Sequence, residues 1–379
     1  MTAAPAALAA AAEALTVHAA DAGWRGPDPY DGLWWPWPRA LVAGRRRRQV
    51  VVQLHARARV DVRRLYRRPP ARIAKTLALF GSAGLRIGSI TGDARPTALA
   101  LNALDTLDGD VSAGPRAWGY PFDVQTRWSY YPAGAPNVVV TAFATAALLD
   151  GARATGRDAF AERARAAARW ALEELWVEPG GFFAYHTDSR VNVHNANLLG
   201  AAAVDAALGD DAGARDRVAR AVDRSLSHQA ADGSWPYGEG GNLGWADSFH
   251  TGYVLLCLSR LRGIDPTVDD AVARGARHYE RFFDAAGRAK LWADRRWPED
   301  AHSAGTGLSA LAALLESGHV ERALLERVAQ RALTAGVRGP TAVARRHRIG
   351  RTTVWYPRWC DGHVALGLAD AATALARPG

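Results

Sequence analysis

The sequence predicts an all-α protein, an (α/α)6 toroid of six helical hairpins with short β-hairpins or turn-rich loops at one end. Two observations support this fold class. The 379-residue chain is rich in Ala and Arg and has few β-branched runs, a composition that favours helix over strand. Apolar segments also recur along the chain at a spacing longer than the roughly 33 to 47 residues of common helical repeats.

The recurring segments each begin at a polar residue that small and apolar residues follow. The five starts lie 57, 56, 52 and 61 residues apart, at Asn137, His194, His250, His302 and His363. The stretches between them are amphipathic, as in the apolar stripe of Val218, Val222 and Leu226. We therefore expect inner helices at the starts and outer helices between them. A further apolar run from Ala71 to Leu85 brings the inner helices to six, enough to close a ring.

Basic residues cluster ahead of the repeats. Thirteen Lys or Arg lie between Arg39 and Lys75 against one acid, Asp61, whereas the whole chain has a net charge of +9. The remainder is slightly acidic, so we expect no nucleic-acid binding. We expect residues 1–70 to form an N-terminal helix and a basic segment that pack on the toroid of residues 71–379. The segment from Arg45 to Arg68 fits contact with an anionic membrane or a phosphorylated lipid carrier, or it is a solvated face without a partner.

Cysteine usage and hydropathy bear on the compartment. Cys257 and Cys360 are too few for a disulfide framework, and the chain lacks a CxxC motif. The N-terminal stretch lacks the basic start of a signal peptide, and no eighteen uncharged apolar residues run together. We expect a cytoplasmic protein, peripherally membrane-bound if the basic segment binds lipid.

Polar residues at the helix starts predict a functional site, because in a toroid these starts open on one end of the central funnel. Asp247 and His250 suit an acid that orients a base, since residues three apart share a helix face. The alternative is that Asp247 only caps its helix and His250 fills space. We expect catalysis from His250, Asp247, His194 and His302. We expect substrate binding from Tyr120, Asp123, Arg127, Asn137, Asn195, Asn197, Trp235, Tyr237, Trp245, Tyr253, Asp300, Tyr356, Arg358, Trp359, Asp361 and His363.

Metal and cofactor binding are not expected. The histidines lie on separate hairpins, and the chain has no ligand motif such as H-E-x-x-H. We therefore predict no metal and no cofactor.

A family resemblance runs through seven segments between about Asp28 and Leu368. They read WGYPFDVQTRW, PAGAPNVVVTAF, RVNVHNANLLGA, QAADGSWPYGE, GWADSFHTGYVL, DAHSAG and YPRWCDGHVALGLA. These segments resemble uncharacterised proteins encoded among bacterial surface-polysaccharide and glycoside assembly genes. Gln229, Gly233 and Trp235 also match the Q-x-x-x-G-x-W pattern of squalene-hopene cyclases, which implies a turn in a helical hairpin. The expected architecture is similar to the six-hairpin N-acylglucosamine 2-epimerase class, from which no residue is carried over.

These features together predict a carbohydrate-active enzyme, a lyase or epimerase that acts on a glycan or glycoside precursor. Aromatic residues suit the C–H faces of sugars, and His with a cation from Arg127 or Arg358 suits proton abstraction beside a carbonyl. Two alternatives remain open. A prenyl-chain or terpene cyclase would need an acidic cluster, for which DTLDGD and DPTVDD are the nearest strings. A non-catalytic sugar-binding or scaffold protein would use the same funnel only to hold a glycan.

Overall fold

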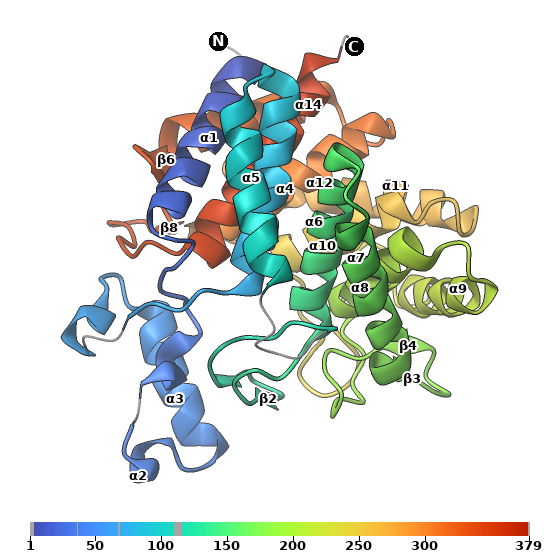
Figure 1. Ribbon diagram of the computed structural model, residues 1–379, viewed down its shortest axis with the longest axis horizontal. Coiled ribbons are helices and arrows are strands. Elements are labelled where there is room, and N and C mark those ends of the chain that lie inside the picture. Colours follow the sequence, from blue (N-terminus) through green and yellow to red (C-terminus); the bar gives the residue numbers. More distant parts are fainter. Residues whose placement is uncertain (1–3, 36, 67–68, 110–115, 378–379) are drawn as a thin grey trace.

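Six apolar helices form the inner wall of a closed ring in the computed structural model of the protein (Figure 1). The structure describes residues 4–35, 37–66, 69–109 and 116–377. Each inner helix contacts the next, and the last contacts the first, so the ring closes. This arrangement confirms the predicted α/α toroid. The inner helices are α4 (Ala74–Thr91), α6 (Val138–Thr155), α8 (His194–Leu208), α10 (Ser248–Arg260), α12 (Ala301–Glu316) and α14 (Gly362–Ala376).

Amphipathic helices form the outer layer, as the stripes in the sequence predict. In α9, Val218 and Val222 are fully buried against the inner layer, because their four-residue spacing places them on one face. The outer helices are α5 (Ala94–Asp108), α7 (Asp158–Trp170), α9 (Ala212–Leu226), α11 (Thr267–Tyr279) and α13 (Arg322–Arg331). The N-terminal α1 (Pro5–Asp21) packs on α14 and α4 and takes the sixth outer position. The predicted division of the chain at residue 70 stays a prediction.

The starts of the inner helices are satisfied in two ways. Side chains cap three of them: Asn137 accepts from the Val140 amide, Asp247 from His250 and Asp300 from Ser303. In addition, the first amide of each of the inner helices α6, α8, α10 and α12 donates to a carbonyl in the loop of the following hairpin. These bonds are Val138 to Tyr185, His194 to Tyr237, Ser248 to Leu291 and Ala301 to Ala344, at 3.0 to 3.1 Å. Each hairpin thus anchors the loop of the next one around the ring.

Short antiparallel strand pairs occur in the connecting loops, as predicted. They are β1 (Val124–Gln125) with β2 (Tyr130–Tyr131), β3 (Trp176–Val177) with β4 (Phe182–Phe183), β5 (Glu299–Asp300) with β8 (Arg345–Arg346), and β6 (Val337–Arg338) with β7 (Thr341–Ala342). The β5 to β8 register pairs Asp300 with Arg345, which brings a loop arginine to the start of α12.

Among the described residues, one helix, α6, is long and apolar enough to cross a membrane by length and composition alone. It lies in the inner wall between α4 and α8, with α7 outside it. Its Asp150 forms an ion pair with Arg86 of α4, with 3.0 Å between the carboxylate oxygen and the guanidinium nitrogen. These contacts indicate a core helix of the ring.

The basic segment forms an arm beside the ring (Figure 1). It contains η1 (Asp31–Trp34), α2 (Arg39–Val42), α3 (Gly44–Arg57) and η2 (Val62–Tyr66). Within the arm, Arg63 of η2 forms an ion pair with Asp31 of η1 at 2.6 Å, and Arg48 ties the arm to β1 by a hydrogen bond to Gln125 at 3.0 Å. Two of the predicted basic residues, Arg67 and Arg68, lie outside the described residues.

Candidate functional site

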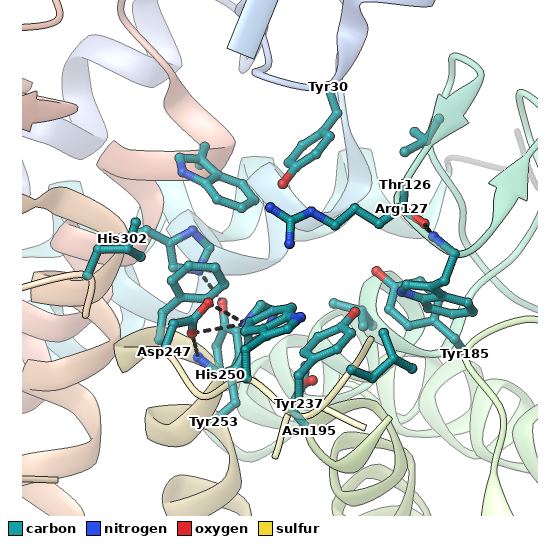
Figure 2. Close-up of a pocket in the computed structure, with 18 of the residues that line it drawn as sticks. Tyr30, Thr126, Arg127, Tyr185, Asn195, Tyr237, Asp247, His250, Tyr253 and His302 are labelled. Carbon is teal, nitrogen blue, oxygen red and sulfur yellow. Dashed lines mark hydrogen bonds and ion pairs between the residues drawn. The ribbon is translucent and has the colours of Figure 1, made fainter. Parts of the chain in front are cut away.

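A cavity of about 280 Å³ opens at the end of the ring where the inner helices begin (Figure 2). Its wall is polar and aromatic. Eleven of the predicted site residues line it: Tyr120, Arg127, Asn195, Tyr237, Trp245, Asp247, His250, Tyr253, His302, Arg358 and Trp359. The expectation that the helix starts converge on one cavity therefore holds for a majority of these residues.

The position that faces the cavity is the second residue of each inner helix. Five of these six residues line it directly, namely Lys75, Val139, Asn195, Phe249 and His302. The sixth, His363, is buried against His302, with ring centroids 4.1 Å apart. Successive helical residues are about 100° apart, so the first residue of an inner helix points away from the cavity, whereas the third can reach its rim, as His250 does in α10.

His250, the third residue of α10, lies at the cavity rim with about a fifth of its side chain exposed. Its Nδ1–H donates to both oxygens of Asp247, at 3.0 and 2.9 Å. One Asp247 oxygen also accepts the His250 backbone amide at 2.9 Å. Asp247 therefore caps the helix and holds the imidazole at the same time, which leaves Nε2 for a ligand.

The floor of the cavity is a buried hydrogen-bonded group centred on Tyr253. Its hydroxyl lies 2.6 Å from Nε2 of His302 and 3.1 Å from Nε2 of His363. Because a phenol carries one proton, it donates to one imidazole and accepts from the other. Burial lowers the pKa of both histidines well below the ordinary value, so both are neutral near pH 7.

Lys75 completes this group and was not predicted. Its Nζ donates to the Tyr253 hydroxyl at 3.3 Å and lies 4.1 Å from the centroid of the Phe143 ring. Burial holds the pKa of Lys75 well below its usual range, with Arg358 adding to the effect. A signal existed in the sequence: Lys75 and Lys290 are the only lysines among 47 basic residues, and Lys75 interrupts an apolar run.

Three arginines give the cavity a cationic wall. Arg358 forms a fully buried ion pair with Asp28, and Arg345 pairs with Asp300 at 2.9 Å. Arg127 extends into the cavity between Tyr30 and His250 (Figure 2) and forms no ion pair within the described part of the chain. Among the described lining residues, the one carboxylate is Asp247. The site is thus arranged to receive negative charge.

Aromatic rings form the remaining wall. Tyr237 stacks on Trp245 with centroids 4.3 Å apart, and both rings pack against His250. Trp359 lies 4.3 Å from the ring of His302. Among the other lining residues that sequence reasoning missed are four large side chains from the N-terminal arm and from connecting loops: Tyr30, Trp128, Tyr185 and Arg345. Their positions depend on ring closure, which no local motif encodes.

Three predicted residues lie behind the cavity, between α8 and α9. His194 is the first residue of α8, so it points outward, and its Nδ1 is 3.2 Å from the Ser225 hydroxyl. Asn197 donates to the same hydroxyl at 2.9 Å, and the Trp235 indole donates to the Ser225 carbonyl at 2.9 Å. The expectation that His194 faces the cavity is therefore wrong. The cavity-facing position of α8 is its second residue, Asn195, and His194 lies one residue before it.

Five other predicted residues serve the surrounding structure. Asn137 and Asp300 are caps, as described above. Asp123 accepts from the Tyr130 hydroxyl at 2.8 Å in an exposed turn. Asp361 is buried and accepts from the Ala342 amide and the Trp355 indole, at 3.0 and 2.7 Å, and burial raises its pKa to about 7. Tyr356 is buried, and the guanidinium carbon of Arg63 lies 5.6 Å from the centroid of the Tyr356 ring.

A second cavity, of about 360 Å³, lies toward the opposite end of the inner helices. Small apolar residues line much of it, together with the ion-paired Arg86, Asp150 and Asp370. Tyr253 borders both cavities.

Comparison with known proteins identifies the fold. The chain matches no known sequence family and no curated protein sequence. Similar solved structures include an unsaturated glucuronyl hydrolase specific for heparin, with TM-score 0.61, 13% identity and coverage of 80% of this chain and 85% of that one. Cellobiose 2-epimerase from Bacillus thermoamylovorans B4167 has TM-score 0.60, 11% identity and coverage of 80% and 88%.

A third solved structure, a possible GH105 family member from Salmonella enterica serovar Paratyphi A, has TM-score 0.56, 13% identity and coverage of 80% and 82%. At these identities the likeness establishes the toroid alone. The expected architectural similarity to sugar 2-epimerases is confirmed, whereas the resemblance to surface-polysaccharide assembly proteins stays a prediction.

Proposed function

We infer that the protein is a carbohydrate-active enzyme that transfers a proton at a sugar carbon beside a carbonyl or carboxylate, as a lyase or an epimerase does. The observation that carries this inference is the Asp247–His250 pair, which faces the same cavity as the unpaired cation Arg127. Proton abstraction from such a carbon needs a positioned base and a cation beside the developing negative charge.

His250 is the base in this proposal. Asp247 fixes the imidazole tautomer by accepting from Nδ1–H, so Nε2 presents a lone pair to the cavity. Two carboxylate oxygens within 3.0 Å also stabilise the imidazolium that forms when Nε2 takes the proton. The carboxylate does not need to move or to change its protonation state.

The second proton-transfer group is the floor of the cavity. His302 reaches the cavity, and its Nε2 contacts the Tyr253 hydroxyl, which also contacts His363. A proton can return to the opposite face of a carbanion from this chain, as an epimerase requires. A lyase would use the same chain to protonate a leaving oxygen. The two outcomes differ in what His302 and Tyr253 protonate.

The substrate in this proposal is an anionic sugar. Arg345 and Arg358 are paired with Asp300 and Asp28, whereas Arg127 forms no ion pair within the described part of the chain and can receive an anionic group of the substrate. The glucuronyl hydrolase and the cellobiose epimerase named above both act on sugars, as their names state, which supports a sugar as the substrate. The cationic lining opposes a carbocation, so it disfavours the terpene cyclase alternative. Hydrolysis by two facing carboxylates is disfavoured by the single acid in the described lining.

Solvent deuterium exchange tests the reaction. The purified protein would be incubated in D₂O with cellobiose, N-acetylglucosamine, and saturated and unsaturated glucuronyl disaccharides, and the products followed by NMR. We expect deuterium at the carbon beside the carbonyl or carboxylate, or an alkene signal from elimination. Saturable binding of a sugar without exchange or product would instead favour the non-catalytic sugar-binding alternative.

Replacing Arg127 by Met tests the charge of the substrate. A lost hydrogen bond to a charged group costs about 1.5 to 3 kcal/mol, so we expect roughly 10- to 100-fold weaker binding of a glucuronyl disaccharide. Binding of cellobiose, which is neutral, should change little. Equal losses for both sugars would argue against an anionic group beside Arg127.

The arm also supports the predicted contact with an anionic membrane or lipid carrier. Large exposed apolar side chains of the described residues concentrate on it: Leu41, Val50, Leu54, Val60 and Leu65 are each more than half exposed. Arg46, Val50 and Leu54 are four residues apart on one face of α3, and Arg45 and Arg47 are exposed beside them. An apolar stripe flanked by arginines suits the interface of an anionic bilayer. Gln53 of the same helix lines the cavity, so a bound membrane would lie near its mouth.

Vesicle sedimentation tests this contact. Replacing Arg45, Arg46 and Arg47 by Ser removes about 1 kcal/mol of attraction each, so binding to phosphatidylglycerol vesicles at low salt should weaken about 100-fold. Arg48 is kept because it bonds to Gln125. A variant with Arg165, Arg169 and Arg295 replaced by Ser has the same net charge and should bind like the parent. Equal binding by both variants would contradict a membrane-binding arm.

A further inference from the structure

A cluster of metal-ligating side chains lies outside the cavity, behind the wall that carries Tyr237. It contains His194 at the start of α8 and His228 and Glu239 in the loop between α9 and α10. One ligand atom from each lies within 4.8 Å of the other two. His194 is fully buried, and His228 and Glu239 are partly exposed, which leaves a path for an ion from solvent.

The hydrogen bonds around the cluster leave acceptors facing one another. His228 Nδ1 lies 2.9 Å from the Arg224 carbonyl, so it carries the proton, and Nε2 is the lone-pair nitrogen. That Nε2 lies 3.5 Å from Oε1 of Glu239. Within the described part of the chain, Nε2 of His194 and Oδ1 of Asn192 are buried without a partner. Asn192 donates its amide hydrogen to the same Glu239 oxygen at 2.7 Å.

We propose that His194, His228 and Glu239 bind a divalent transition-metal ion, with Zn²⁺ as the best match. Two imidazoles and one carboxylate are a common zinc ligand set, completed by a water molecule in the fourth position. Two surrounding contacts orient these ligands as a metal site requires: the Arg224 backbone carbonyl fixes one imidazole, and the Asn192 amide holds the carboxylate.

The ion would stabilise the cavity wall. Glu239 is two residues from Tyr237, whose carbonyl accepts the first amide of α8 at 3.0 Å. Tyr237 in turn stacks on Trp245 beside His250. Metal binding would therefore tie the loop that carries both rings to the start of α8. Arg224 already neutralises Glu239, so we expect affinity on the order of micromolar, weaker than that of a dedicated zinc finger.

Zinc titration of the untagged, chelator-stripped full chain tests the proposal. With a chromophoric zinc indicator as competitor, we expect one site per chain, and Co²⁺ should give the visible absorption of a tetrahedral ion. Replacing the partly exposed His228 by Ala should weaken binding at least 10-fold. The control is His319→Ala, which removes another histidine paired with a carboxylate, and it should bind as the parent does. Failure of the parent to bind, or equal affinity in His228→Ala, would overturn the proposal.

A gain-of-affinity variant makes the test independent of folding defects. Arg224→Gln removes the cation that competes for Glu239, so zinc binding should tighten at least several-fold if Glu239 is a ligand. The thermal unfolding midpoint of this variant should rise on adding Zn²⁺ and remain unchanged with Mg²⁺, which prefers oxygen ligands. Unchanged or weaker zinc binding by a folded Arg224→Gln protein would exclude Glu239 from the site.

Discussion

The starts of α8 and α10 are alike in sequence but differ in what their histidines do. His250 is the third residue of its helix, and it reaches the cavity with Asp247 behind it. His194 is the first residue of its helix and turns toward Ser225 in the outer layer. A shift of two positions along a helix rotates a side chain by about 200°. In a repeat protein, therefore, the position relative to the helix start decides whether a histidine serves the cavity or the layer behind it.

The largest expected effect tests the α10 side of this comparison. His250→Gln keeps approximate size and hydrogen bonding but removes the titrating group. The rate of deuterium incorporation should fall by roughly 10²- to 10⁴-fold, as for a lost general base, while sugar affinity changes little. His319→Gln is the matched control on the outer surface and should retain the parent rate. A His250→Gln rate within about threefold of the parent would show that His250 is structural.

Lys75 extends the comparison to α4, where the inward position carries a buried cation. Lys75→Met keeps the length of the side chain, and replacement of buried charged groups by apolar ones often stabilises proteins by about 1 to 4 kcal/mol. Because the folded state lowers the pKa of Lys75, the unfolded chain binds the proton more tightly, so the parent should gain stability as pH rises toward 10.5. Urea unfolding of both proteins at pH 7 and pH 9.5 measures this. The difference in free energy of unfolding between Lys75→Met and the parent should be smaller at pH 9.5 than at pH 7. An equal or larger difference would contradict a lowered pKa of Lys75.

Asp247 has two roles in α10, and one substitution separates them. Ser is as good a helix cap as Asp, so Asp247→Ser should keep the free energy of unfolding within about 0.5 kcal/mol. It removes the partner of the imidazole Nδ1, so the exchange rate should fall roughly 10- to 100-fold. If the rate is retained, Asp247 acts only as a cap. A large loss of stability with an unchanged rate would lead to the same conclusion.

The smallest effect tests the α8 side. Ser225→Ala removes the hydroxyl that contacts His194 and accepts from Asn197. We expect a loss of about 0.5 to 1.5 kcal/mol in the free energy of unfolding, the net value of a typical hydrogen bond, with no change in the exchange rate. Chemical denaturation measures the first and NMR the second. A rate loss as large as that of Asp247→Ser would mean that the layer behind α8 takes part in catalysis.

Much of the fold could be predicted from local patterns. The alternation of apolar and amphipathic helices reflects two layers, and the cap residues Asn137, Asp247 and Asp300 mark three inner starts. The recurrence of polar starts also predicted that one end of the ring carries the cavity. These features are local, so a single sequence contains them.

The composition of the site was less predictable, because it depends on rotation and on closure. His194 begins α8 as expected, but the cavity-facing position is the second residue of the helix, and which residue of a helix start turns inward is a difference of one residue that sequence patterns rarely resolve. Tyr30 and Arg345 reach the cavity from the arm and from a strand pair, through contacts between distant segments. Lys75 was the exception, since a lone lysine in an apolar run of an arginine-rich chain is itself a signal.

Tyr253 borders both cavities, so its side chain forms part of the base of the cavity that contains His250. In the proposed function, a sugar would enter and leave by the same mouth, so product release would precede the next binding event. The Tyr253 hydroxyl also belongs to the proton-transfer chain of the proposed function. We expect removal of the Tyr253 side chain to connect the two cavities. In the proposed reaction, water could then reach the carbanion from the second cavity and protonate it without stereochemical control. Tyr253 would therefore have two roles, proton transfer and the exclusion of water.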